Sequence, residues 1–144
     1  MLKNNLYYFN KPMNLVLDRD KYDIDNVFFY DPVKNTVMDD SIFIRIIYSN
    51  EHIILNGIYF NVNLNINNMD KELNFLQMFE ENLLNGYDIG KRKIHIKKIK
   101  EHLMYLIKKI YNDNINIKYL LKISGIWEGE HNIGLTFKFI FQGN

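Results

Sequence analysis

The chain of 144 residues contains no cysteine and no alanine, only two prolines and only three arginines. The lack of cysteine excludes disulfide bonds and thiolate metal sites, and it suits a reducing compartment. No apolar run approaches the roughly 20 residues of a membrane-spanning helix. The first residues also lack the apolar core and cleavage site of a secretory signal. We therefore expect a soluble intracellular protein that does not associate with membranes.

Asn, Ile, Lys, Tyr and Phe are abundant instead. These are residues of AT-rich codons, so the composition reports on the genome as well as on the protein. Hydrophobic residues make up 47% of the chain and aromatic residues 15%, which is enough for a packed core. The length predicts a single domain over residues 1–144, with residues 1–12 flexible.

Charge is segregated along the chain although the net charge is only +1. Residues 1–87 carry a net charge of −5, whereas residues 88–122 carry +7. Two interpretations of this basic block stay open. Lysine is the ordinary solvated residue of an AT-rich protein, and a basic track is also what phosphate groups require.

Hydrophobic periodicity predicts strands, then two helices, then strands. Residues 41–49 form the clearest predicted strand, and residues 52–67 predict one long strand or a bent pair, with Gly57 at a bulge or sharp bend. From Ile58 to Ile66 apolar and polar side chains alternate with a period of two. The period then changes, and it predicts helices over residues 69–84 and about 95–111, a helical insertion of about 69–111. Residues 115–124 and a closing hairpin follow. We expect an α+β fold that is mainly antiparallel β, and specifically a small OB-like barrel with two helices inserted before its last strands.

Signals for catalysis are weak. The acidic run from Asp18 to Asp25 has Asp23 where a calcium loop needs glycine and Phe29 where it needs glutamate. Asp39-Asp40 fits a solubilising turn better than a nuclease site. Nucleophile elbows, phosphate loops and dinucleotide fingerprints are missing. The histidines show no metal-ligand spacing: His52, His95, His102 and His131. We expect no enzyme activity, no metal, no cofactor and no small-molecule substrate.

Strand alternation identifies candidates for binding single strands, which need cations for phosphates and flat aromatic faces for bases. If the isoleucines of residues 42–46 face the core, Phe43 and Arg45 point outward together. The same parity places Tyr59, Lys122 and Lys138 on the outside. An aromatic side chain beside an arginine on a wet sheet face is unusual for a purely structural barrel.

Trp127 is the only tryptophan, and its placement is open. It shares parity with Leu121 and Ile123, which favours packing in the core. A bulge at Gly125 would invert that parity and expose the indole.

Several segments resemble a family of short uncharacterised proteins of nucleocytoplasmic large DNA viruses. They are DPVKNTVM at residues 31–38, FIRIIYS at 43–49, LNGIY at 55–59, LKISGIWE at 121–128 and GLTFK at 134–138. More distantly, the chain resembles bacteriophage single-stranded DNA-binding proteins with one OB barrel. The resemblance implies a viral protein in the host cytoplasm, at the viral factory, or in the nucleus.

The leading hypothesis is a non-enzymatic viral single-stranded DNA-binding protein that acts in replication or recombination. Lys34, Arg45, Lys122 and Lys138 would hold phosphates, and Phe43 and Tyr59 would stack bases. Lys91, Arg92 and Lys93 would extend the track. The alternative is a structural or interaction module, such as a minor virion component or a replication or transcription scaffold, that meets another protein or a second copy through its strand edges.

Overall fold

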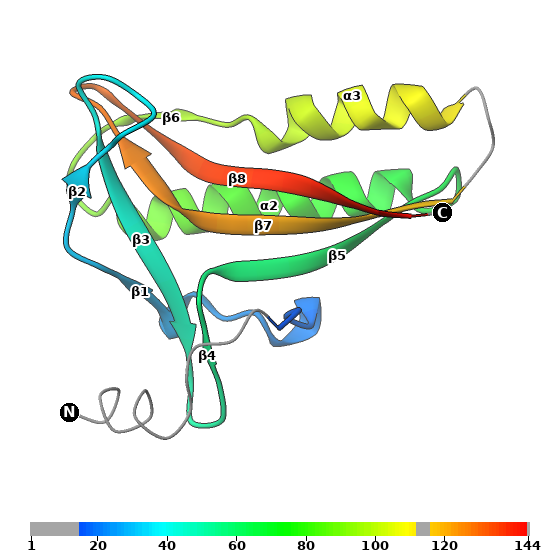
Figure 1. The fold of residues 1–144 in the computed structure, drawn as a ribbon, viewed down its shortest axis with the longest axis horizontal. Coiled ribbons are helices and arrows are strands. Elements are labelled where there is room, and N and C mark those ends of the chain that lie inside the picture. The colour runs from blue at the N-terminus through cyan, green and yellow to red at the C-terminus, as the bar shows by residue number, and fades with distance from the viewer. Residues whose placement is uncertain (1–14, 112–115, 144) are drawn as a thin grey trace.

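The computed structural model describes residues 15–111 and 116–143 and shows an α+β chain in which strands predominate (Figure 1). Two 3-10 turns precede the first strand, and two helices separate β5 from the last two strands. The predicted flexibility of residues 1–12 lies outside the described residues. In order, the elements are η1 Arg19–Lys21, η2 Ile24–Asn26, β1 Val27–Phe29, β2 Val33–Lys34, β3 Ile42–Ser49, β4 Ile54–Leu55, β5 Ile58–Leu64, α2 Met69–Tyr87, β6 Ile94–Ile96, α3 Ile99–Tyr111, β7 Ile117–Glu128 and β8 Asn132–Gly143.

Strand β7 lies at the centre of one eight-stranded sheet. β8 pairs with it antiparallel along most of its length, while β5 and β3 share its other edge, at residues 117–123 and 125–128. The short strands β1, β2 and β4 pair with β3, and β6 runs parallel to β8. The sheet is therefore mixed, and it curls into a half-barrel. The α+β class is confirmed, the pairing is not purely antiparallel, and the OB-type barrel stays a prediction.

Both helices pack on one face of the sheet, the inner face. Their apolar stripes join the inward side chains of the strands in a single core cluster, because each stripe must be removed from water. From α2 and α3 the cluster takes Leu76, Phe79, Leu83, Leu84, Ile99, Leu103 and Leu106. From β5 and β7 it takes Ile58, Phe60, Val62, Leu64, Leu121, Ile123 and Ile126.

The second helix begins later than predicted, at Ile99 rather than near His95. His95 belongs to β6, which pairs with Ile133 on β8. The carboxylate of Glu80 on α2 accepts the backbone N–H groups of Lys98 at 3.1 Å and Ile99 at 3.3 Å. These first-turn donors have no partner within their own helix, so the contact with α2 fixes where α3 starts.

The first helix ends later than predicted, at Tyr87 rather than at Leu84. Gly86 lies inside α2, where a Cβ atom would come within 2.9 Å of the Ile24 side chain. Because Gly86 has no side chain, α2 can pack closely against η2 at this position. The glycine does not end the helix.

A bulge in β7 decides where Trp127 lies. The register between β7 and β8 shifts between Ile123 and Gly125. Ile123 and Ile126 therefore both face the core, and Gly125 and Trp127 both face away from it. Trp127 is half-buried on the side opposite the helices, so the core placement favoured by simple parity is wrong.

Gly57 marks a bend between β4 and β5, as the sequence predicted. Its φ angle is +91°, a conformation that side chains rarely adopt, and an added Cβ would lie 2.7 Å from the Ile123 carbonyl oxygen. Residues 52–67 thus form a bent pair of strands rather than one long strand.

Candidate nucleic-acid interface

The sheet face opposite α2 and α3 is called the outer face below. Most of the strand residues that the sequence predicted for binding point out from this face. The described outward positions of β3, β5, β7 and β8 include no carboxylate. A face without carboxylates is favourable for an anionic ligand. Its outward side chains include Phe43, Arg45, Tyr59, Asn61, Asn63, Lys118, Leu120, Lys122, Trp127, Thr136, Lys138 and Ile140.

Phe43 and Trp127 are cross-strand partners on this face, on β3 and β7. Each ring lies against the backbone of a glycine on a neighbouring strand. A Cβ atom at Gly125 would come within 2.9 Å of the Phe43 ring, and one at Gly134 within 2.6 Å of the indole. Both rings are half-buried. They therefore form a platform on the sheet, seated on bare backbone and partly open on the other side.

This platform belongs to a hollow of about 590 Å³, called the aromatic hollow. The loop between β2 and β3 forms one wall, and β7 and β8 form the floor. Two lysines, Lys34 and Lys98, are among its lining residues, together with the small polar residues Ser124 and Thr136. The full lining is Val33, Lys34, Asn35, Thr36, Val37, Met38, Phe43, Lys98, Ser124, Trp127, Leu135, Thr136 and Phe137.

Lys122 and Lys138 stand directly opposite each other on β7 and β8. Like charges at such positions are destabilising by roughly 0.2–1 kcal/mol, so the pair favours an anion between or above it. The Lys122 ammonium lies 5.7 Å from the centre of the Tyr59 ring. Tyr59 itself is only 4% exposed. Its ring is therefore not open to a base, contrary to the prediction that it stacks one.

Arg45 is exposed but engaged. Its Nε donates to the Asn56 side-chain oxygen at 3.0 Å, and its guanidinium lies 5.5 Å from the centre of the Tyr30 ring. These contacts position the guanidinium and leave some of its five N–H donors for a phosphate.

The predicted extension through Lys91, Arg92 and Lys93 does not join the outer face. The ammonium groups of Lys91 and Lys93 each lie 3.4 Å from Glu128, and the Lys93 ammonium also donates to the Gly129 carbonyl at 2.8 Å. Arg92 is exposed in a loop with a φ angle of +58°. Two of the three cations therefore neutralise a carboxylate rather than continue a phosphate track.

Glu128 is the centre of that charge cluster and is only 8% exposed. Burial by itself raises the pKa of its carboxyl group. The Tyr87 hydroxyl, which donates to it, and the two lysines outweigh burial, so the pKa lies below its ordinary value. Nearby, the His95 ring is 2.7 Å from Asp88 and holds the pKa of that carboxyl below its usual range.

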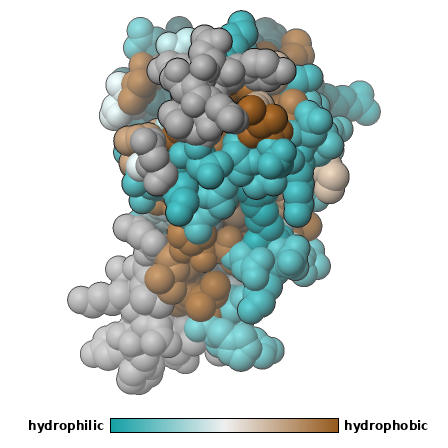
Figure 2. Space-filling view, turned by 90° about the vertical axis from the view of Figure 1, so that its right-hand side faces the viewer, coloured by the Kyte–Doolittle hydropathy of each residue, from teal (hydrophilic) through white to brown (hydrophobic). Residues whose placement is uncertain are grey.

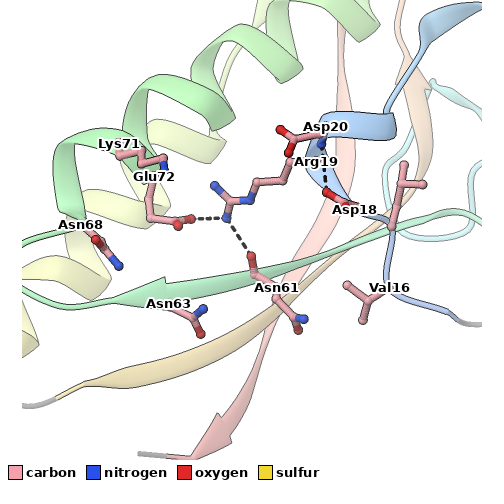
Figure 3. Close-up of a pocket in the computed structure, with 10 residues that line it drawn as sticks. Val16, Asp18, Arg19, Asp20, Asn61, Asn63, Asn68, Lys71 and Glu72 are labelled. Carbon is pink, nitrogen blue, oxygen red and sulfur yellow. Dashed lines mark hydrogen bonds and ion pairs between the residues drawn. The ribbon is translucent and has the colours of Figure 1, made fainter.

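A second hollow, of about 620 Å³, lies where η1 meets β5 and the start of α2 (Figure 3). Arg19 reaches across it, donates to the Asn61 carbonyl at 2.7 Å and forms an ion pair with Glu72. Its guanidinium also lies 4.6 Å from the centre of the Phe75 ring. Arg19 thus clamps the N-terminal segment onto the sheet and helix, and the lining carries Asp18, Asp20 and Glu72 beside two cations, a poor match for an anion.

The same side of the molecule is mostly hydrophilic, with a hydrophobic patch in its lower half (Figure 2). Leu15 and Val16, which lead into η1, are 48% and 44% exposed. Val16 lines the second hollow together with three acidic residues, so the outer face is the better candidate for a nucleic acid.

Sequence reasoning missed Ser124, Thr136 and Lys98 as members of the aromatic hollow and left Trp127 out of the site. The serine-glycine pair before Ile126 was the available signal, because a bulge there reverses the parity of everything that follows. Lys98 carried no signal, since its position depends on where α3 begins.

No protein-family model, curated protein or solved structure matches this chain. Among residues 15–111 and 116–143, no cluster of three or more histidine or acidic side chains is arranged to hold a metal ion. No helix in the same described ranges is long and apolar enough to cross a membrane.

Proposed function

We propose that this chain is a non-enzymatic single-stranded DNA-binding protein that acts in the replication or recombination of a large DNA virus. It binds with the outer face of the sheet, in the manner of OB-type proteins. Bases stack in the aromatic hollow on Phe43 and Trp127. Lys34, Lys122 and Lys138 hold the phosphates on either side, with Arg45 next to Phe43.

The Phe43–Trp127 platform is the observation that supports this proposal most strongly. Two aromatic rings of neighbouring strands, seated on glycine backbone in a hollow edged by lysines, offer π-faces and cations within one site. Every base has a π-face, so such a site binds single strands without needing a sequence. A duplex hides its bases and fits the hollow less well.

Trp127 provides a direct test because it is the only tryptophan of the chain. Titration with oligo-dT should quench its fluorescence, since a base stacked on the indole changes its emission. Three lysine–phosphate contacts predict that log K falls with log salt concentration with a slope of about −2. Duplex DNA of the same length should bind more weakly at equal salt.

Phe43→Ala removes half of the platform and leaves the reporter in place. Loss of one base–aromatic stack is worth about 1–3 kcal/mol, or roughly 5- to 150-fold in affinity. The double variant Phe43→Ala, Arg45→Ala should abolish binding. Phe28→Ala, at a β1 residue that is 37% exposed, is the matched control and should bind normally. Unchanged affinity of Phe43→Ala, or no quenching at low salt, contradicts the proposal.

The unpaired edge of β8 favours a second candidate, a viral structural or protein-interaction module without nucleic-acid binding. Among the described residues, β8 pairs with β6 only at Asn132–Gly134, and from Leu135 onward β7 is its single strand partner. An open edge of this kind can pair with a second copy or another chain. Size-exclusion chromatography with and without a labelled oligonucleotide separates the two candidates.

A further inference from the structure

The aromatic hollow does not end at the sheet, because Lys98 connects it to α3. Lys98 also lines a neighbouring hollow of about 420 Å³ with Glu101, His102 and Tyr105. Glu101 and Tyr105 in turn line a third hollow, of about 540 Å³, whose other members are Lys97, Lys100, Met104 and Lys108. Three adjoining depressions thus run from the platform along the exposed side of α3.

The junction between sheet and helix is closed by aromatic contacts. The His102 ring packs against β8, with its centre 5.1 Å from that of Phe139 and 5.9 Å from that of Phe137. His102 therefore joins α3 to the inner face of β8, one turn before Tyr105 on the same helix. Tyr105 is 59% exposed there and lines both hollows of α3.

Cations predominate on this surface, although the Lys97 ammonium lies 3.8 Å from the exposed carboxylate of Glu81. Lys97, Lys98, Lys100 and Lys108 are exposed, and Glu101 is the one carboxylate that lines the two α3 hollows. Glu101 pairs with the Lys98 ammonium at 3.2 Å, with both side chains well exposed. Such surface pairs are worth only about 0.2–1 kcal/mol, so a phosphate can replace the carboxylate as the partner of Lys98.

We infer that a bound single strand leaves the aromatic hollow at Lys98 and continues along α3. Lys97, Lys100 and Lys108 bind its phosphates, and Tyr105 offers a second stacking position. This inference rests on the proposed function and deepens it by naming the path of the strand. The 13 residues of α3 span about 20 Å, which accommodates at most about six nucleotides at 3.4 Å each.

Two lengths of oligo-dT test the path separately from the hollow. An oligomer of about four nucleotides should quench Trp127 with a salt slope of about −2, set by the hollow alone. An oligomer of about twelve nucleotides should bind more tightly with a slope of about −5, because Lys98 is engaged together with Lys97, Lys100 and Lys108. In the double variant Lys100→Gln, Lys108→Gln, the longer oligomer should lose affinity and its slope should become shallower by about 1.4. Affinity for the short oligomer should not change.

Glu101→Gln gives a test that misfolding cannot imitate. Removing the carboxylate frees Lys98, so affinity for the longer oligomer should rise by about 1.5- to 5-fold. Lys71→Gln, at the exposed start of α2 beside the second hollow, is the matched control and should have no effect on either oligomer.

The outcomes distinguish the inference from the function on which it rests. If the short oligomer fails to quench Trp127 at low salt, the proposed function fails, and the inference fails with it. If the short oligomer binds but the two slopes are equal and Glu101→Gln binds no more tightly, the strand does not follow α3. The hollow then remains a site by itself.

Discussion

Glu80 is expected to control the position of α3, and its replacement should be costly. The side chain is only 1% exposed, and its carboxylate is the acceptor for two N–H groups in the first turn of α3. In Glu80→Ala, the buried Ile99 N–H loses its partner at a cost of about 1–3 kcal/mol. The Lys98 N–H lies nearer to water and adds less, and the small cavity left by the side chain adds about 1 kcal/mol.

We therefore expect Glu80→Ala to lower the free energy of unfolding by about 3 kcal/mol. For a chain of this size that corresponds to a fall in Tm of roughly 10 °C. Urea unfolding followed by circular dichroism measures the first quantity, and a thermal scan measures the second. Glu81→Ala, at the next position of α2 but exposed and only 3.8 Å from a lysine, should cost about 0–0.5 kcal/mol.

Glu80→Gln separates the hydrogen bonds from the charge. Its amide oxygen still accepts the two N–H groups, so it should cost about 1 kcal/mol or less at neutral pH. Burial raises the pKa of Glu80 above its ordinary value of 4.5, and the two N–H groups offset only part of that effect. Between 4.5 and the raised value, the folded state keeps a proton that the unfolded state has lost. Stability from this group therefore falls as pH rises through that window.

The stability of Glu80→Gln relative to the wild type should consequently improve from pH 4 to pH 7. Two results would refute the reasoning. One is a cost for Glu80→Ala no larger than that of Glu81→Ala. The other is a Glu80→Gln variant as unstable as Glu80→Ala. That result would mean that the charge of Glu80, and not its hydrogen bonds to the start of α3, stabilises the fold.

Two further predictions concern charged groups elsewhere in the fold. Glu128→Gln leaves Lys91 and Lys93 without a counter-charge and should cost about 1–2 kcal/mol at neutral pH. Because the pKa of Glu128 is lowered in the folded state, its contribution is present above 4.5 and lost as pH falls below it. The stability difference between the wild type and the variant in urea unfolding should thus shrink as the pH falls below 4.5. Lys138→Thr relieves the repulsion from Lys122 and should stabilise the fold by about 0.5 kcal/mol while weakening oligo-dT binding. A Lys138→Thr variant that is less stable than the wild type, or that binds oligo-dT equally well, would contradict the proposal that Lys122 and Lys138 bind an anion.

The regular part of the fold could be predicted because each element repeats one pattern. Period-two alternation located β3, β5 and the closing pair of strands, and a 3.6-residue stripe located both helices. β6 was missed because three residues of parallel strand are held by their pairing with β8 and have no pattern of their own. The start of α3 was misplaced for a similar reason, since Glu80 acts from another helix.

The site was predictable only up to the bulge in β7. Alternation placed Phe43 and Lys122 on one face, and the structure places them there. One extra residue before Gly125 then moves Trp127 from the predicted core to that same face. A single-residue insertion reverses every later side chain in a strand. Parity arguments therefore need independent support wherever serine and glycine interrupt a strand.

Folding also divides the basic block of residues 88–122, which looked like one continuous track. Lys91 and Lys93 neutralise Glu128, whereas Lys118 and Lys122 point outward from the sheet. The lysines of α3 form a third group, and Lys98, the residue before α3, lines the aromatic hollow on the sheet. A net charge counted along the sequence overstates what one ligand can reach. The fold therefore gives a sharper expectation than the sequence. Binding should depend on the lysines of the sheet and of α3, and it should not depend on Lys91 and Lys93.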